Sequence, residues 1–342
     1  TVSDLTAVGA SALAANTTGT NNTAFGRAAL SNNVTGSLST AVGFQALTLA
    51  TGGSNTAVGS NAAAAITTGA NNVAVGTNSL LTNQTGNLCV AIGSGALQNS
   101  TVNDLTAVGA GALGANTSGT NNTAVGRFSL GANLTGLQCT AVGQNTLAAL
   151  QTGTGNTAFG FQAINSGTGG SNNVAVGVSA LFNGGAASDN TAIGNNALLL
   201  ATVSNLTAVG SGALATNSNG TLNTAVGRSS LAANTTGSDN TAVGNDALAT
   251  NITGSFNTAV GQGAATLSTG NRVTAIGRRA LNANTSGSDN TAVGQNAMFL
   301  NQTGATCVAV GSGALASSTV SDLTAVGASA LTANTTGGSN TA

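Results

Sequence analysis

Apolar residues recur along this chain in one short phrase, Thr-Ala-Val-Gly or a close variant, which is found twenty times. The glycine that closes each phrase, here called the key glycine, returns every 16 or 17 residues. A period this short and regular is typical of a solenoid, in which each repeat is a coil that packs only on its neighbours. The key glycines are Gly9, Gly26, Gly43, Gly59, Gly76, Gly93, Gly109, Gly126, Gly143, Gly160, Gly177, Gly194, Gly210, Gly227, Gly244, Gly261, Gly277, Gly294, Gly311 and Gly327.

Each repeat is too short to hold a helix and a returning segment, and its Thr-Ala-Val core alternates and is β-prone at both ends. The sequence therefore predicts an all-β fold, a parallel β-solenoid (β-roll) of about twenty 16–17-residue coils. Stacking at about 4.8 Å would bring equivalent residues of successive coils into columns. We expect residues 1–342 to form one continuous solenoid, a window of a longer repetitive chain, because residues 319–342 nearly repeat residues 1–24.

Three columns vary only among residues that suit a protein core, and we expect them to fill the coil. The residue directly before the key glycine is Val, Ile or Phe, and the third residue before it is Thr or Val. The fourth residue after it is Leu in most coils. The predicted core is represented by Val8, Phe25, Val42, Val58, Leu13, Leu30 and Leu47.

The residue two before the key glycine is alanine in every coil. Strand alternation puts this alanine on the face opposite the valine and threonine, so we expect it to point outward against a closely packed second chain. The alternative is a very thin coil with alanine inside and valine and threonine outside, which would expose a ladder of apolar side chains. The predicted chain–chain interface is Ala7, Ala24, Ala41, Ala57, Ala74, Ala91, Ala107, Ala124, Ala141, Ala158, Ala175 and Ala192.

The composition excludes several classes of function. Only 4% of the residues are charged and the net charge is −1, so the chain has no field that would attract nucleic acid or an anionic membrane. The longest apolar run, Ala197 to Val203, is far shorter than the roughly 20 residues that span a bilayer. We expect neither nucleic acid nor membrane insertion among the partners of this chain.

Few residues here can carry chemistry. Histidine and lysine are absent, so no general base is available to activate the many serines and threonines, and we do not expect an enzyme. The three cysteines, Cys89, Cys139 and Cys307, replace Asn in one column and lie too far apart for a disulfide or a zinc site. Aspartates five residues before some key glycines are expected to cap turns, so no metal or other cofactor is predicted.

Many turns contain Asn-x-Thr or Asn-x-Ser, for example at Asn33 and Asn116. In a secreted eukaryotic protein these asparagines would be acceptors for N-glycosylation. The alternative is that the turn itself prefers Asn and Thr, whose side chains bond to the backbone. We favour the turn chemistry, because it explains the pattern without reference to a host.

The stretches "NNVAVGTNSL" (Asn71 to Leu80) and "CVAIGSGAL" (Cys89 to Leu97) resemble the head repeats of trimeric autotransporter adhesins. They are also similar to Asn-Thr-Ala-Val-Gly repeats in phage tail-fibre and bacterial surface proteins. The resemblance implies a parallel β-roll in which three chains associate along the axis and present a binding surface. It also implies an extracellular place, on a cell surface or a virion.

We therefore expect a structural or adhesive extracellular fibre, a homo-oligomeric β-solenoid rod such as a phage tail fibre, surface adhesin or filament shaft. Its first partner would be itself, with a homotrimer favoured, and a cell-surface receptor or glycan would be the external partner. The alternative is an ice-binding solenoid with a Thr-rich flat face, which requires Thr6, Thr23 and Thr40 to point into solvent. A β-helical enzyme acting on polysaccharides would need clustered acids or bases, which the sequence lacks.

Overall fold

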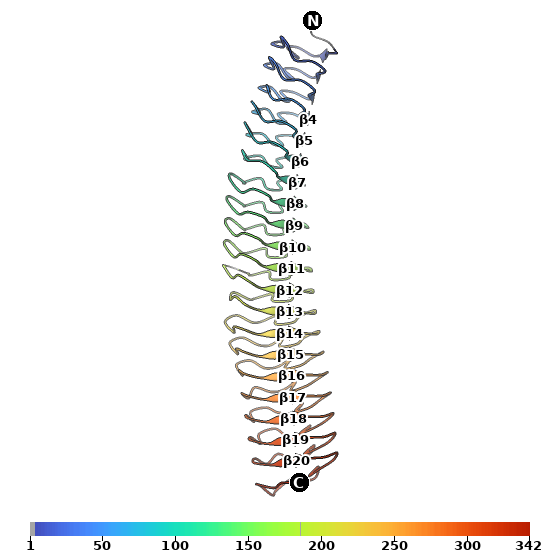
Figure 1. The fold of residues 1–342 in the computed structure, drawn as a ribbon, viewed down its shortest axis with the longest axis vertical. Coiled ribbons are helices and arrows are strands. Elements are labelled where there is room, and N and C mark those ends of the chain that lie inside the picture. The colour runs from blue at the N-terminus through green and yellow to red at the C-terminus, as the bar shows by residue number, and fades with distance from the viewer. Residues whose placement is uncertain (1–3, 185) are drawn as a thin grey trace. The chain divides into compact units, whose positions relative to one another are not determined.

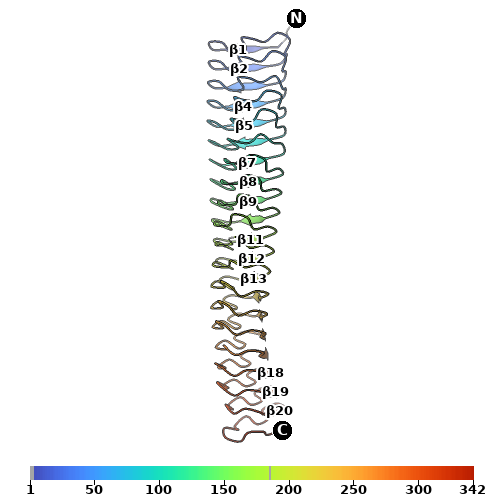
Figure 2. The ribbon, with the colours of Figure 1, turned by 90° about the vertical axis from the view of Figure 1, so that its left-hand side faces the viewer.

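Short parallel strands and tight turns make up the whole described fold. The computed structural model describes residues 4–184 and 186–342, and these contain strands, turns and bends without a helix. Two compact units are present, residues 1–172 and residues 173–342, and each is a parallel β-solenoid as the repeat predicts. Within each unit the coils follow one another in chain order (Figures 1 and 2).

Each coil contributes one strand of three residues. The first unit holds β1 (Thr6–Val8), β2 (Thr23–Phe25), β3 (Thr40–Val42), β4 (Thr56–Val58), β5 (Val73–Val75), β6 (Val90–Ile92), β7 (Thr106–Val108), β8 (Thr123–Val125), β9 (Thr140–Val142) and β10 (Thr157–Phe159). The second unit holds β11 (Val174–Val176), β12 (Thr191–Ile193), β13 (Thr207–Val209), β14 (Thr224–Val226), β15 (Thr241–Val243), β16 (Thr258–Val260), β17 (Thr274–Ile276), β18 (Thr291–Val293), β19 (Val308–Val310) and β20 (Thr324–Val326).

The strands pair in parallel with equivalent residues side by side. Between β2 and β3, Thr23 pairs with Thr40 and Ala24 pairs with Ala41, and the other strand pairs within each unit share this register. The amide of Thr23 donates to the carbonyl of Ser39 at 2.9 Å, which extends the ladder beyond the strand. Like residues therefore form columns along the axis of each unit.

The key glycine ends each strand because no other residue fits there. Gly59 has φ +135°, and a Cβ on it would lie 2.7 Å from the backbone carbonyl carbon of Gly76 in the next coil. The coil then turns through residues in left-handed conformation that are not glycine, such as Ala28 at φ 58° and Leu30 at φ 49°. Such a conformation is uncommon for leucine, and here the burial of its side chain holds it in place.

The interior of the coil is filled by alanine, leucine and asparagine. Ala24, Ala29 and Leu30 each have 0% of their surface exposed in a single chain. The prediction that the strand alanines face outward is therefore wrong, because these side chains point into their own coil. Buried alanines of the predicted interface are Ala24, Ala41, Ala57, Ala74, Ala91, Ala107, Ala124, Ala141, Ala158, Ala175 and Ala192, whereas Ala7, in the first described coil, is exposed.

The predicted core is half right. Leu13, Leu30 and Leu47 are buried, as expected from the leucine column. The strand positions are inverted: Val8, Phe25 and Val58 are exposed and Val42 is only half-buried. Strand alternation holds, but its phase is shifted by one residue, and such a shift moves every side chain to the opposite face. We attribute the shift to space, because buried leucine and alanine columns already fill the interior and alanine is the smallest of the strand side chains.

Buried asparagines complete the interior. Asn22 accepts a hydrogen bond from the amide of Ser39 at 3.0 Å and donates to the carbonyl of Gly36 at 2.7 Å. Asn33 donates to the same carbonyl at 2.9 Å and accepts from the Gly36 amide at 2.8 Å. These side chains satisfy backbone groups of the turn that the short strands cannot reach.

Enlarging a strand alanine should destabilise the fold. We expect Ala124→Val to lower the free energy of unfolding by about 1–3 kcal/mol, because the added methyl groups overfill a closed interior. The measurement is urea denaturation followed by circular dichroism. The matched control is Thr123→Val on the outward face, where β5 already carries Val73, and its effect should stay within about 0.5 kcal/mol. Equal effects of the two substitutions would contradict the assignment of inside and outside.

Candidate functional site

The outward face of the strands is the main candidate site. On each strand the first and third residues point away from the coil while the middle alanine points in, as the alternating burial of β4 and β15 shows. The first position carries Thr in most coils and Val in β5, β6, β11 and β19. The third position is always Val, Ile or Phe, so the strands of each unit present a column of hydroxyls beside a column of apolar groups.

We call the residues at the third strand position the apolar ladder. In the first unit these are Val8, Phe25, Val42, Val58, Val75, Ile92, Val108, Val125, Val142 and Phe159. In the second unit these are Val176, Ile193, Val209, Val226, Val243, Val260, Ile276, Val293, Val310 and Val326.

Much of the apolar ladder is open to water in a single chain, while members such as Val42 and Val125 are half-buried. Phe25 is 56% exposed, Ile92 is 39% exposed and Val243 is 37% exposed. No coil places a charged residue at either outward strand position. Soluble monomers rarely expose a continuous apolar strip of this length, and such strips mark surfaces that contact another molecule.

Arginines stand beside this face rather than on it. Arg27 and Arg127 directly follow key glycines, and both are exposed. The Arg27 guanidinium carbon lies 5.4 Å from the centroid of the Phe44 ring, and that of Arg127 lies 5.1 Å from the Phe128 ring. These contacts cover part of two exposed aromatic rings with a polar group.

The cysteines lie in the interior of the coil, where they replace asparagine. Cys139 is buried, its amide donates to Asn122 Oδ1 at 2.9 Å, and its Sγ lies 3.4 Å from the Gly153 carbonyl. In the coil before it, Asn122 donates to the equivalent carbonyl, that of Gly136, at 2.7 Å. All three thiols are free, and burial raises the pKa of each of them.

The asparagines of the Asn-x-Thr and Asn-x-Ser turns are structural. Asn33 and Asn116 are fully buried, and each donates its side-chain amide to a glycine carbonyl three residues further on. An oligosaccharide on such a nitrogen would break that bond and could not fit inside the coil. The turn chemistry therefore explains these residues in the folded chain.

Charged residues of the described coils lie on the surface and form few contacts. Arg272 pairs with Asp289 in the next coil, with Nη2 at 2.8 Å from Oδ2, and this arginine lowers the pKa of the exposed carboxyl group. Among residues 4–184 and 186–342, no three His, Cys, Asp or Glu side chains gather closely enough to hold a metal ion. The same residues contain no helix long and apolar enough to cross a membrane.

Comparison with known proteins does not assign this chain to a family. No protein-family model matches this sequence, and no curated protein is found as a relative. The strand face and the surface of the coils are therefore the features that bear on function.

The buried thiols should make the fold sensitive to alkali. Burial, together with the nearby Asp104 carboxylate, raises the pKa of the Cys89 thiol from its ordinary value of 9.0 to about 11. Below pH 9 both the folded and the unfolded chain keep the proton, so this contribution to stability is fully present. Between pH 9 and pH 11 the unfolded chain ionises first, and the free energy of unfolding falls as the pH rises.

Urea midpoints measured from pH 8 to pH 10.5 test this expectation. The decline should be smaller in Cys89→Ser, because Ser39 already occupies the equivalent position in another coil and does not titrate in this range. Identical pH profiles for the two proteins would show that the Cys89 thiol is accessible to solvent in the folded state.

Proposed function

We propose that this chain is a structural or adhesive extracellular fibre, a homo-oligomeric β-solenoid in which the apolar ladders of several copies pack together. The observation that carries the proposal is the exposed ladder, which every coil repeats without a charged or small polar substitute. The strand alanines, which the sequence suggested as the contact, are buried in their own coil and lend no support. The valines and threonines beside them take that role.

The free energy available is of the right size for association. Complete burial of a valine contributes about 1.5–3 kcal/mol, so a ladder residue that is roughly two fifths exposed leaves about 0.5–1 kcal/mol, and the half-buried members leave less. Ten coils of one unit then offer at most about 5–10 kcal/mol, which lies within the range of the general cost of association, about 4–15 kcal/mol. The second unit adds a ladder of the same length.

A second copy of the chain suits this face better than an unrelated protein does. The ladder repeats at the spacing of parallel strands, about 4.8 Å, and only a partner with the same spacing can match it coil after coil. Another solenoid of the same sequence supplies that spacing and the same apolar column. The resemblance to trimeric adhesin heads favours three copies around one axis, and it supports an extracellular place on a cell surface or virion.

Ice binding is the second candidate, and one observation favours it. The Thr column points out of the coil, as that function requires, and the threonines of each unit stand in register. Two features weigh against it. Valine interrupts the Thr column in four coils, and the bulky Phe25 and Phe159 interrupt the neighbouring column. A flat and regular array for water is therefore broken at several places.

Charges within the ladder should separate the copies. The full chain should elute with a mass that is a multiple of 32.1 kDa, and three times this mass is expected. The double variant Val125→Asp and Val243→Asp should elute as a monomer, because packing would bury uncompensated carboxylates. Size-exclusion chromatography with light scattering measures both masses.

The matched control is Leu88→Asp, which places a carboxylate at an exposed position outside the ladder where other coils carry Asp104 or Asp239. This variant should keep the mass of the unaltered protein. A wild-type chain that remains at 32.1 kDa at micromolar concentration would refute the proposed association.

Thermal hysteresis separates the two candidate functions. If the fibre proposal holds, the unaltered chain should produce none at micromolar concentration, since the outward threonines then lie at or beside the contact between copies. Ice crystals should also grow without faceting. Hysteresis that disappears in Thr123→Asn, at an unchanged mass, would instead support the ice-binding function.

A further inference from the structure

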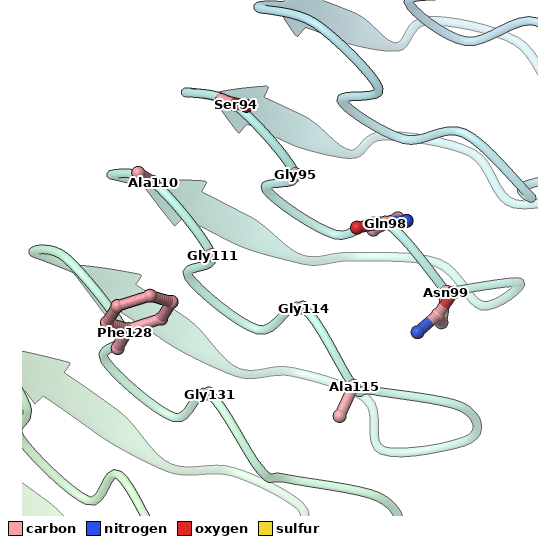
Figure 3. Close-up of a pocket in the computed structure, with 10 residues that line it drawn as sticks. All are labelled: Ser94, Gly95, Gln98, Asn99, Ala110, Gly111, Gly114, Ala115, Phe128 and Gly131. Carbon is pink, nitrogen blue, oxygen red and sulfur yellow. The ribbon is translucent and has the colours of Figure 1, made fainter.

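A hollow of about 510 Å³ opens on the surface of the first unit, on the segments that follow β6, β7 and β8. Its floor is formed by Gly95, Gly111, Gly114 and Gly131. In Figure 3 the Phe128 ring stands on one side of this floor and the side chains of Gln98 and Asn99 stand on the other. The hollow lies outside the apolar ladder, on a different part of the coil.

The fold does not require these glycines. Gly95 and Gly111 have φ of +66° and +67°, yet other coils place Asn61 and Ser179 at the same position with φ of 56° and 54°. Gly114 and Gly131 lie five residues after a key glycine, where other coils carry side chains as large as leucine and phenylalanine. The hollow therefore results from omitted side chains at positions that tolerate them.

The Phe128 ring is the apolar wall of the hollow. It is 47% exposed, and a Cβ on Gly111 would lie 2.6 Å from its Cδ1 and Cε1 atoms. The ring thus lies directly against the glycine of the previous coil, and the Arg127 guanidinium stacks near it. An alanine at position 111 would displace the ring from its place.

The opposite wall is polar and neutral. Gln98 is half-buried and Asn99 is exposed, and their side-chain amides form no hydrogen bond with the described residues. Each amide offers two N–H donors and a carbonyl acceptor. No charged residue is among those that line the hollow, and the nearby Arg127 guanidinium contacts the Phe128 ring from outside this lining. A ligand that suits it has one apolar face, several neutral hydroxyl groups and no charge.

We propose that this hollow binds a neutral pyranose, with one C–H face of the sugar on the Phe128 ring and its hydroxyl groups on the Gln98 and Asn99 amides. Aromatic faces are electron-rich and attract the polarised C–H groups of a sugar ring, while paired amides match neighbouring hydroxyls. Pockets of this kind combine an apolar surface with a few placed polar groups. The inference gives the proposed adhesive fibre its ligand class, but binding needs no association of copies.

The second unit supplies an internal comparison. Its segment after β13 corresponds to the segment after β7 but has Ala215 in place of Gly114, and Ser229, after β14, stands where Phe128 follows β8. The coil before it carries Leu199 in place of Gln98. This equivalent surface therefore lacks the aromatic ring and the amide wall, and of the floor glycines it keeps one, Gly212 in the place of Gly111.

The test uses the full chain with methyl β-D-glucopyranoside, methyl β-D-galactopyranoside and methyl α-D-mannopyranoside as probes. Saturation-transfer NMR should show transfer to the C–H protons of one ring face of at least one probe. Titration should then give a dissociation constant that Gly114→Leu and Phe128→Ser each weaken by at least about tenfold, a loss of about 1.4 kcal/mol. Leucine and serine already occupy these positions in other coils, at Leu199 and Ser229.

The matched control is Ala215→Leu, which makes the same change in the second unit and should leave binding unaltered. Three outcomes would overturn the inference: no transfer to any probe, equal transfer in Gly114→Leu, or equal transfer to cyclohexanol, which lacks the array of hydroxyls. The mass of Gly114→Leu in solution should equal that of the unaltered chain. A failure of sugar binding is thereby distinguished from a failure of the proposed fibre.

Discussion

The narrow interior of the coil is the constraint on which the rest of this structure depends. The strand alanines, such as Ala124, and the leucine column, such as Leu130, are fully buried within their coils, and we infer that this interior admits little more than a methyl group at the centre of each strand. The β-branched residues that favour strands must then lie on the outside. The fold thus exposes an apolar ladder as a direct consequence of its thin cross-section. In the proposed assembly, a second copy that covers the ladder would complete a core that a single chain does not enclose.

Strands of three residues form too few hydrogen bonds to satisfy the remaining residues of each coil, and buried asparagines make up the difference. Asn22 and Asn33 meet at the carbonyl of Gly36, and Asn122 repeats this contact at Gly136. Because Asn22 binds the next coil, through the Gly36 carbonyl and the Ser39 amide, a shift of one coil against another would leave buried polar groups unpaired. The same rows that fill the interior therefore also fix the register of the columns.

Much of the fold can be predicted from the sequence, and the failure has a definite physical origin. The key glycines give the period, and Leu30 and Leu47 correctly mark a buried column. Strand alternation allows two arrangements, with either the alanine or the valine and threonine facing the interior. Because alanine and valine are both apolar, hydrophobicity alone does not distinguish these two arrangements. The choice depends on the distance between the walls of the coil, which no local pattern reports. Once the phase is wrong, the candidate interface moves from the valines to the alanines.

The hollow beside Phe128 cannot be predicted from the sequence alone, because the sequence does not show which side chains of each coil reach the surface. Its signal in the sequence is a set of glycines, such as Gly114, at places where other coils carry larger residues. In most proteins an isolated glycine indicates a backbone requirement. In a solenoid the equivalent coils provide a direct comparison, because they show which positions accept a side chain.

Comparison of equivalent coils also distinguishes two surfaces, the apolar ladder and the segment that follows the key glycine. The apolar ladder is nearly uniform, as the proposed contact between copies requires, whereas the residues after the key glycine range from Arg27 to Phe44 and Ser94. A surface that takes no part in stacking or association is free to change from coil to coil. A single coil can therefore acquire a recognition site, as we infer for Phe128, without altering the assembly of the others. In the fibre that we propose, the constraint that keeps the ladder uniform also leaves the rest of the coil surface free for specific recognition.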